Sequence, residues 1–402
     1  MLVTIPAHLA AQTDVVVPSE RVVTFVNVRQ GPSITVIRPP WAHSTGANTQ
    51  SCSGLVPLWY RIRLSDGSEG FVSKAWTKVA PAPALPVAGD VPFKVHFLDV
   101  GTGDAAIIDI GTAEIIIDGG DSETVLRNYV RARDIIDGPL ELLEVTRGDT
   151  DHWKGLARLM NFGGRGPNPP QVLEFWDPGY DRLCNSPSDG GRKNYLAFIE
   201  YFKELDGVEF RRPLAQHFPP AVETGELQPF MLSSIPDVTF TLLHADATPA
   251  SDNGECSYLI NNASIVLRLQ IGTTRFLFTG DANGKERDQE DANQVGHVEG
   301  ALLQLEQQVT GILLADVLKV PHHGSETAST IPFIERVDPR FVIISASTRH
   351  NLPKDTVVDR YQSSGRVILR TDVDRAFNND HIVCAKEPGM ALKCDYESAF
   401  ID

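Results

Sequence analysis

The loop at residues 146–152, with the sequence TRGDTDH, carries the densest group of side chains that can do chemistry. It places two carboxylates, Asp149 and Asp151, and the imidazole of His152 within four positions, directly after the apolar segment 140–145. Zinc, manganese and similar metals take carboxylate and imidazole ligands that converge on one point. Taken alone, the same residues also fit a turn in which Asp151 caps the helix that follows.

Two further segments repeat this pattern of an apolar strand that ends in potential ligands. Asp281 follows the segment 276–278 and a Thr-Gly pair, and His322 and His323 follow the apolar segment 317–320. Three strands that each finish in Asp or His favour one shared metal site at a sheet edge over three coincidences.

The segments around these residues alternate between strand-like and helix-like patterns. Apolar and β-branched runs bounded by glycine predict strands, and the i, i+4 pair Leu126 and Val130 predicts a helix. Interleaved strands and helices are typical of a layered α/β domain. The predicted strands lie at 93–100, 105–110, 113–117, 140–145, 238–243, 265–271, 275–279, 317–320, 341–345 and 366–369, and the predicted helices at 123–133, 153–160, 194–205 and 302–308.

A Pro/Ala-rich segment at 81–86 divides the chain, because such sequence is stiff, extended and excluded from helices and central strands. We therefore expect a small β-rich domain at 1–80, a linker at 81–91 and a larger domain at 92–402.

The N-terminal segment resembles bacterial SH3-like domains. Residues 26–33 read VNVRQGPS, close to that family's LNVRSGPS signature, and the segments 60–62 and 66–72 match its later pieces. The resemblance covers about residues 18–80 and implies a small β-barrel. Such a barrel either packs against the larger domain or binds a peptide, a glycan or a protein, and the residues leave that choice open.

The charge of the chain limits its partners. Its 402 residues include 36 Lys and Arg against 52 Asp and Glu, for a net charge of −16. This excess repels nucleic-acid phosphates at long range, which argues against a protein that coats DNA or RNA. It does not exclude a nuclease, because bound divalent metals and a few arginines can invert the local field.

The five cysteines form no C-x-x-C pair, and their number is odd. We therefore expect free thiols in a reducing compartment, and neither a disulfide framework nor a cysteine zinc site. No apolar run is long enough to cross a bilayer, and residues 1–17 lack the basic residues that begin a signal peptide. These features predict a cytoplasmic protein with no membrane partner, and a signal peptide removed beforehand is the alternative.

Taken in order, the motifs of residues 92–385 resemble the metallo-β-lactamase domain of the ComEC competence family. That family carries DVGQGDA, IDGG, SHPDADH, N-x-S-x-V-L, TGD and LKVPHHGS. The chain has DVGTGDA at 99–105, IDGG at 117–120, the 146–152 loop, NASIVL at 262–267, TGD at 279–281 and LKVPHHGS at 318–325. The resemblance implies an αββα sandwich and a hydrolase that uses zinc or manganese. It also implies an anionic substrate, with cleavage of phosphodiester bonds or nucleic acids proposed for the DNA-uptake branch.

The resemblance carries ligand positions over to this chain. They are Asp149, Asp151 and His152 in the first loop, Asp281 as the carboxylate shared by two metals, and His322 or His323 as the late histidine. Asp118 matches an aspartate that braces the site. His244 lies near the position of a middle histidine ligand, although a lone histidine after a strand is more often structural.

The chain departs from the family at Arg147, where relatives carry histidine. A guanidinium is always charged and offers no lone pair to a metal. One metal therefore keeps a full set of ligands, whereas the other loses its first histidine and retains two carboxylates and, at most, His244. We expect one firmly held metal, a weak or absent second, and an Arg147 that can clamp a substrate phosphate.

A second departure lies at Leu352, where relatives often carry the histidine of a His-Pro pair. His350 comes two residues earlier and can reach the same cleft. The nearby Arg349 and Lys354 either attract an anionic substrate or are simply solvated, and the residues leave both interpretations open.

These residues together predict hydrolysis in which a metal acidifies water and polarises the scissile bond. Asp149 or Asp281 would orient or deprotonate the water, with Asp151 beside the metal. Arg147 or His323 would stabilise charge that develops on the phosphoryl or carbonyl oxygen. Phosphodiester hydrolysis is the first expectation. Two alternatives stay open: a catalytically degenerate, metal-binding scaffold or interaction protein, and a hydrolase of esters, lactones or amides.

Overall fold

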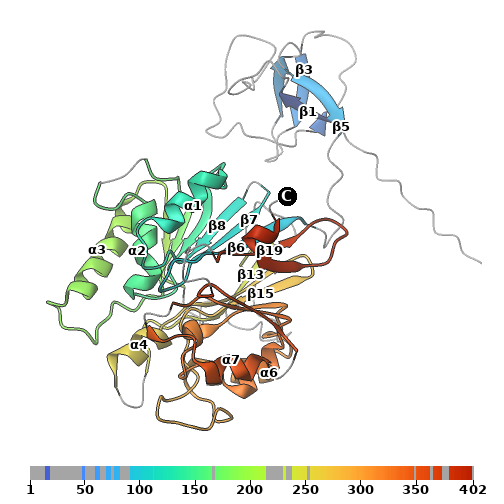
Figure 1. The fold of residues 1–402 in the computed structure, drawn as a ribbon. Helices are drawn as coiled ribbons and strands as arrows, with labels where there is room; N and C mark the ends of the chain where they lie inside the picture. Colours follow the sequence, from blue (N-terminus) through green and yellow to red (C-terminus); the bar gives the residue numbers. More distant parts are fainter. Residues whose placement is uncertain are drawn as a thin grey trace, which may run out of the picture. The chain divides into compact units, whose positions relative to one another are not determined.

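The computed structural model describes residues 14–18, 48–49, 59–63, 69–73 and 77–81, and residues 91–400 apart from 112, 165–167, 214–229, 232–237, 251–253, 348–349, 363–364 and 374–379. The chain divides into two compact units, residues 1–86 and 87–402, each with sheets of its own (Figure 1).

The N-terminal unit contains one antiparallel sheet of short strands in the order β4-β3-β2-β1-β5. The strands are β1 (Asp14–Pro18), β2 (Asn48–Thr49), β3 (Trp59–Arg63), β4 (Glu69–Ser73) and β5 (Thr77–Pro81). The segments 60–62 and 66–72 of the SH3-like resemblance overlap β3 and β4, whereas the segment 26–33 and most of the linker lie outside the described residues. The SH3-like barrel therefore stays a prediction.

The second unit is built on two mixed sheets, one of eight strands and one of seven. The first has the order β11-β10-β9-β8-β7-β6-β19-β20, and the second β12-β13-β14-β15-β16-β17-β18. The first contains β6 (Phe93–Phe97), β7 (Ala106–Ile110), β8 (Ala113–Ile117), β9 (Leu140–Glu144), β10 (Glu174–Trp176), β11 (Glu209–Arg211), β19 (Ile382–Lys386) and β20 (Lys393–Tyr396). The second contains β12 (Phe230–Met231), β13 (Val238–His244), β14 (Val266–Ile271), β15 (Thr274–Phe278), β16 (Val317–Lys319), β17 (Phe341–Ile344) and β18 (Val367–Arg370).

Helices cover the outer face of each sheet (Figure 1). They are α1 (Val125–Arg133), α2 (Thr150–Leu159) and α3 (Gly190–Glu204) on the first sheet, and α5 (His297–Gln308), α6 (Ile331–Val337) and α7 (Asp355–Gln362) on the second. The short helix α4 (Cys256–Asn262) precedes β14.

The layers follow from apolar strands that are buried on both faces. Successive side chains of a strand point to opposite faces, so Ile115 and Ile117 of β8 pack in the core between the sheets and Ile116 packs under the helices. The core between the sheets also includes Phe240 and Phe276 of the second sheet. The predicted αββα sandwich is thus confirmed.

The sandwich brings the ends of several strands together. Strands β8 to β10 run parallel in the first sheet, and β15 to β17 run parallel in the second. The loops after β8, β9, β15 and β16 carry the motifs that contain Asp118, the 146–152 loop, Asp281 and the His-His pair. The residues that the sequence predicts to bind a metal therefore lie in loops at this edge of the sandwich.

Helix α2 begins earlier than the sequence suggests. It starts at Thr150, so Asp149 and not Asp151 occupies the N-cap position, and Asp149 makes no side-chain capping hydrogen bond. The capping interpretation of Asp151 is therefore wrong, and its carboxylate is left for other partners.

Four of the five cysteines are paired, so the expectation of free thiols is wrong for them. Cys184 bonds to Cys256, 72 residues away, and Cys384 bonds to Cys394 across the neighbouring strands β19 and β20. These pairs could not be predicted from the spacing of the cysteines in the sequence, because their partners become neighbours only when the chain folds. Disulfides persist mainly in oxidising compartments, which argues against the predicted cytoplasmic location. Within the described ranges, no helix has the length and apolar character needed to cross a bilayer.

Glu114 of β8 offers a test of the first sheet. Its side chain is buried, and burial together with the carboxylates of Asp137 and Asp109 raises its pKa to about 8. The folded state therefore binds this proton more tightly than the unfolded state, so stability is lost as pH rises from the unfolded pKa to the folded one.

The Glu114→Gln variant is expected to lose this pH dependence. Relative to the wild type it gains stability between pH 5 and 8, by at most about 1.4 kcal/mol per pH unit, because no charge has to be buried. Urea unfolding at several pH values measures the difference, with the exposed Glu335→Gln as control. Parallel curves for the wild type and Glu114→Gln would show that Glu114 titrates normally.

Candidate metal centre

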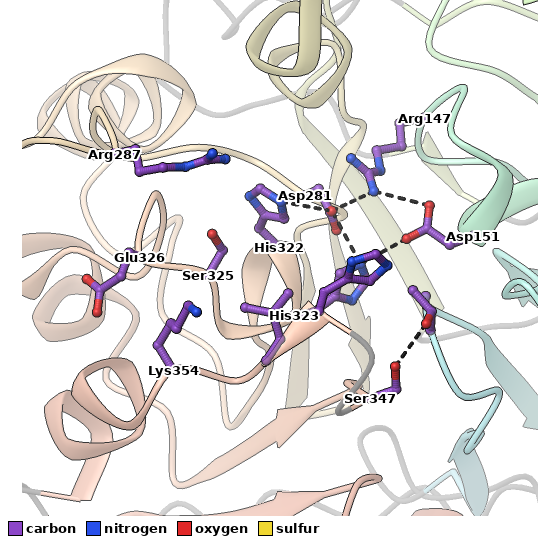
Figure 2. Close-up of a pocket in the computed structure, with 14 residues that line it drawn as sticks. Arg147, Asp151, Asp281, Arg287, His322, His323, Ser325, Glu326, Ser347 and Lys354 are labelled. Atoms are coloured by element: carbon purple, nitrogen blue, oxygen red, sulfur yellow. Dashed lines mark hydrogen bonds and ion pairs between the residues drawn. The ribbon is translucent and has the colours of Figure 1, made fainter. Parts of the chain in front are cut away.

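Four side chains from segments that follow strands of both sheets converge at the shared strand edge. Asp151 and His152 lie in the first turn of α2, Asp281 follows β15, and His323 lies in the 3-10 turn η2 (Pro321–Gly324) after β16. His152, Asp281 and His323 are buried, and Asp151 is partly exposed to a pocket that all but His152 line (Figure 2). We call these four residues the donor cluster.

The spacing of the donor cluster suits a metal ion. Nε2 of His323 lies 3.3 Å from an oxygen of Asp281 and 3.6 Å from one of Asp151. Nε2 of His152 lies 3.5 Å from the other oxygen of Asp281 and 4.0 Å from the other oxygen of Asp151. Ligands about 2.0–2.2 Å from a tetrahedral zinc are about 3.3–3.6 Å apart.

Several buried atoms of the cluster also lack hydrogen-bond partners. Within the described part of the chain, Nε2 of His152, Nε2 of His323 and Oδ1 of Asp281 make no hydrogen bond, while Oδ2 of Asp281 forms an ion pair with Arg147. Buried polar atoms are normally satisfied, so three such atoms around one point fit a cation-binding site better than a structural role. The donor set of two imidazoles and two carboxylates suits zinc or manganese.

Asp118 fixes the orientation of His152. Its carboxylate accepts hydrogen bonds from the backbone N–H of Thr146 at 2.8 Å and from the Thr146 hydroxyl at 2.6 Å. The same carboxylate lies 2.7 Å from Nδ1 of His152. A proton on Nδ1 leaves Nε2 as the free donor atom, the usual arrangement around a metal-binding histidine.

A second carboxylate orients His323. Nδ1 of His323 lies 3.1 Å from Asp104 and 3.0 Å from the carbonyl oxygen of Ser345, and Nζ of Lys319 lies 2.7 Å from the other oxygen of Asp104. Asp104 was not singled out from the sequence, although it is the last aspartate of the DVGTGDA motif.

Gly103 explains why that motif needs glycine. Its φ is +105°, and a Cβ atom there would lie 1.8 Å from the carbonyl oxygen of Asp151. Only glycine allows the 99–104 loop to lie directly on the start of α2. This contact lets the backbone N–H of Asp104 donate to Asp151 and holds the two parts of the site together.

Arg147 fills the other half of the site. Its buried guanidinium lies 2.7 Å from Asp281, 3.0 Å from Asp149 and 3.3 Å from Asp151, and it donates to the side chain of Asn261. Three carboxylates that could otherwise attract a second cation therefore surround a fixed positive charge. Figure 2 shows Arg147 reaching Asp281 and Asp151.

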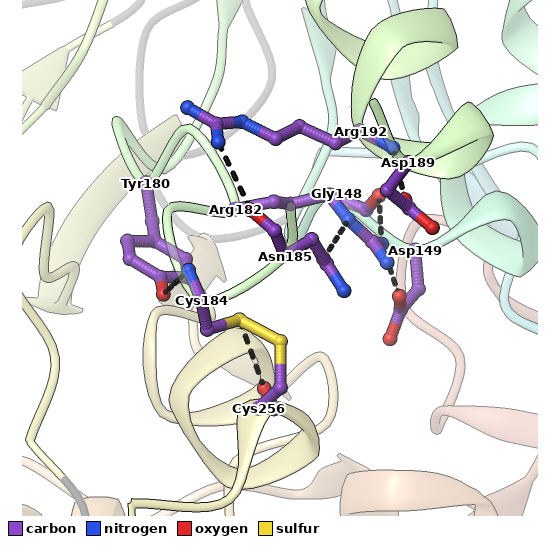
Figure 3. Close-up of a disulfide and its surroundings, with 9 residues drawn as sticks. All are labelled: Gly148, Asp149, Tyr180, Arg182, Cys184, Asn185, Asp189, Arg192 and Cys256. Atoms are coloured by element: carbon purple, nitrogen blue, oxygen red, sulfur yellow. Dashed lines mark hydrogen bonds and ion pairs between the residues drawn. A yellow bond between two sulfur atoms is a disulfide. The ribbon is translucent and has the colours of Figure 1, made fainter. Parts of the chain in front are cut away.

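Two residues that the sequence did not reveal hold this arrangement. Arg182 forms an ion pair with Asp149 and donates to the carbonyl oxygen of Gly148 at 2.7 Å. Asn261, at the end of α4, accepts from Arg147. The Cys184–Cys256 disulfide connects the loop of Arg182 to the start of α4 (Figure 3). One covalent bond thus joins the two segments that hold Arg147 and Asp149.

The charges of the site balance one another. Burial alone would raise the pKa of Asp151 and Asp281, but Arg147 and the neighbouring histidines hold both well below the usual value. Burial and Arg147 would lower the pKa of His152, but Asp118 and Asp281 raise it to about 10. The ionised carboxylates are therefore stabilised by positive charge at the site, which protons on the histidines or a divalent cation can supply.

The other predicted histidines lie outside the donor cluster. Nε2 of His322 is 3.7 Å from Asp281, and its Nδ1 lies 2.9 Å from the Thr327 hydroxyl. Of the two late histidines, His323 is the one whose Nε2 lies between Asp151 and Asp281. His244 does not line the pocket, and its Nδ1 donates to the carbonyl oxygen of Ser264 at 2.9 Å, which leaves its Nε2 free, so its role as a ligand stays a prediction. His350 lines the same pocket.

Comparison with known proteins gives partial matches. No family model matches the chain. The chain is 33% identical over 141 residues to ComE operon protein 3 of Bacillus subtilis (strain 168). The aligned region covers 34% of this chain and 15% of that protein. It is 37% identical over 108 residues to the uncharacterized protein YcaI of Escherichia coli (strain K12), covering 26% and 12%. It is 30% identical over 118 residues to competence protein ComA of Neisseria gonorrhoeae, covering 29% and 15%. The matches thus span less than a sixth of each relative.

Solved structures match more of the chain at lower identity. The metallo-β-lactamase fold protein YhfI from Bacillus subtilis covers 69% of this chain and 96% of that chain, with 15% identity and a TM-score of 0.39. The metallo-β-lactamase SMB-1 bound to 2-mercaptoethanesulfonate covers 60% and 80%, with 14% identity and a TM-score of 0.33. At these values the likeness says nothing about activity.

Proposed function

Because this chain is a metallo-β-lactamase-fold protein related to ComE operon protein 3, ComA and YcaI, we propose that it is a metal-dependent hydrolase of phosphodiester bonds. The observation that carries the proposal is the donor cluster, in which two oriented imidazoles and two carboxylates from both sheets meet beside a pocket. The choice of phosphodiesters rests on the order of motifs shared with the ComEC family.

Asp151, His152, Asp281 and His323 would hold one divalent cation. When bound, such a cation supplies a Lewis acid that polarises a phosphoryl oxygen and lowers the pKa of water. Asp118 and Asp104 keep the two imidazoles in the orientation that this requires. His323 then acts as a ligand and not as the free cation that the sequence also allowed.

Arg147 would supply the positive charge that relatives obtain from a second metal. It lines the pocket beside Asp151 and Asp281, so its guanidinium can stabilise charge that develops on a phosphoryl oxygen. Asp149 is bound to both Arg147 and Arg182, which suits it to position Arg147 and not to accept a proton from water. This assignment replaces its expected role as a base.

The test is a panel of chromogenic substrates offered to the full chain. The protein is stripped with a chelator under non-reducing conditions and reloaded with Zn²⁺ or Mn²⁺. Bis(p-nitrophenyl) phosphate, p-nitrophenyl phosphate and p-nitrophenyl acetate represent a phosphodiester, a phosphomonoester and a carboxylic ester. We expect metal-dependent release of nitrophenol from the diester, at a rate well above that from the other two.

Each other outcome has a defined meaning. Cleavage of the acetate alone would indicate a carboxylic-ester hydrolase that uses the same metal site. Tight metal binding without turnover of any substrate would indicate a metal-stabilised binding protein. Failure to bind either metal would remove the basis of the proposal.

A further inference from the structure

The pocket at the donor cluster extends well beyond the metal ligands. It has a volume of about 510 Å³, which is in the usual range for small-molecule sites. One end is lined by Asp151, Asp281 and His323, and the pocket continues to Arg287 and Lys354 (Figure 2). A single scissile phosphate next to the metal would leave this second end of the pocket unused.

The two cations at that end have no competing partners in the described part of the chain. Neither Arg287 nor Lys354 forms an ion pair with any described residue, whereas Arg147 is surrounded by three carboxylates. The one carboxylate that lines this end, Glu326, is bound to Arg360 at 2.8 Å. The positive charge at this end of the pocket therefore belongs to residues outside the donor cluster.

Both cations are anchored by their backbones. The N–H of Arg287 donates to the hydroxyl of Tyr258 at 2.7 Å. The N–H of Lys354 donates at 3.0 Å to the carbonyl oxygen of Gly324, the residue after His323. Lys354 is thus tied directly to the turn that carries a metal ligand, which fixes its place relative to the donor cluster.

We propose that Arg287 and Lys354 bind a second phosphate of the substrate, an inference that rests on the proposed function. The preferred substrate then carries one phosphate at the donor cluster and another nearby, as successive phosphates of a polynucleotide strand do. The chain has a net charge of −16 and repels polyanions in general, so two cations that line the same pocket as the donor cluster offer a phosphate local attraction beside the metal ligands. A guanidinium and an ammonium are the usual phosphate-binding groups.

Binding of thymidine 3′,5′-bisphosphate and thymidine 5′-monophosphate to the metal-loaded protein tests this inference. Calorimetric titration is expected to show that the wild type prefers the bisphosphate. The double variant Arg287→Gln/Lys354→Gln should lose about tenfold in affinity for the bisphosphate, because two partly exposed charge pairs are removed. Its affinity for the monophosphate should fall by much less.

The matched control removes the same charge elsewhere. Arg336 on α6 and Lys193 on α3 are exposed and do not line the pocket, so Arg336→Gln/Lys193→Gln should keep the wild-type preference. An equal loss in the control pair would show a general charge effect and overturn the inference. So would a bisphosphate preference that survives in Arg287→Gln/Lys354→Gln.

A kinetic comparison separates this inference from the proposed function. The p-nitrophenyl ester of thymidine 3′-phosphate is offered with and without a 5′-phosphate, and KM for the 5′-phosphorylated ester should rise in the pocket variant. If the wild type cleaves neither ester but still shows the binding preference, the second phosphate site stands and the proposed hydrolysis fails. If it cleaves both with equal KM and binds both nucleotides equally, the hydrolysis stands and the second site fails.

Discussion

Replacing Asp151 and His152 together with alanine is expected to abolish tight metal binding and to lower hydrolysis at least about a thousandfold. The two side chains supply half of the donor cluster, one carboxylate and one buried imidazole Nε2. The remaining Asp281 and His323 offer too few ligands to hold zinc against a chelator. Elemental analysis after dialysis and turnover of the diester probe measure the two effects.

The control for this variant is the residue directly before the two replaced residues. The side chain of Thr150 is exposed, so Thr150→Ala should retain both metal and turnover. Cooperative thermal unfolding of the double variant shows that the fold survives. Unchanged turnover in a folded double variant would reject the assignment of the donor cluster.

Replacing Arg147 with histidine is expected to raise the metal content from about one to about two equivalents per chain. The guanidinium now lies among Asp149, Asp151 and Asp281, where it repels a second cation and offers no lone pair. An imidazole at this position removes the repulsion and adds a donor, while the carboxylates stay. Elemental analysis of the wild type and variant, prepared in parallel, gives the result.

The variant Arg147→Gln separates the loss of charge from the gain of a ligand. It leaves three carboxylates around an uncharged amide, so the metal-free protein should lose about 3–5 kcal/mol of stability. Without an added imidazole it should not retain a second equivalent through dialysis. Two tightly held equivalents in the wild type, or one in Arg147→His, would contradict the interpretation of Arg147.

Much of the fold was predictable because local patterns determine it. Apolar runs such as the one in β8 indicate strands that are buried on both faces, and the interleaved helices indicate layers on both sides. The donor cluster was also accessible from sequence, since each of its members follows a strand. Asp151 and His152 follow β9, whereas Asp281 and His323 follow β15 and β16.

The partners of Arg147 were not predictable, because they are remote in sequence. Asn261 lies 114 residues from Arg147, and Arg182 lies 33 residues from Asp149. The choice between His322 and His323 depends on the backbone of η2, where both residues have positive φ. A sequence pattern does not report such a conformation for residues other than glycine.

The Cys184–Cys256 bond has a practical consequence for anyone who handles the protein. Dithiothreitol or a similar additive in the purification buffer would cut the tether between the loop of Arg182 and the helix that ends near Asn261. The same additive is itself a soft chelator of zinc. Samples with different redox histories would therefore differ in both the shape of the arginine side of the site and its ion content, and only samples with the same history are comparable.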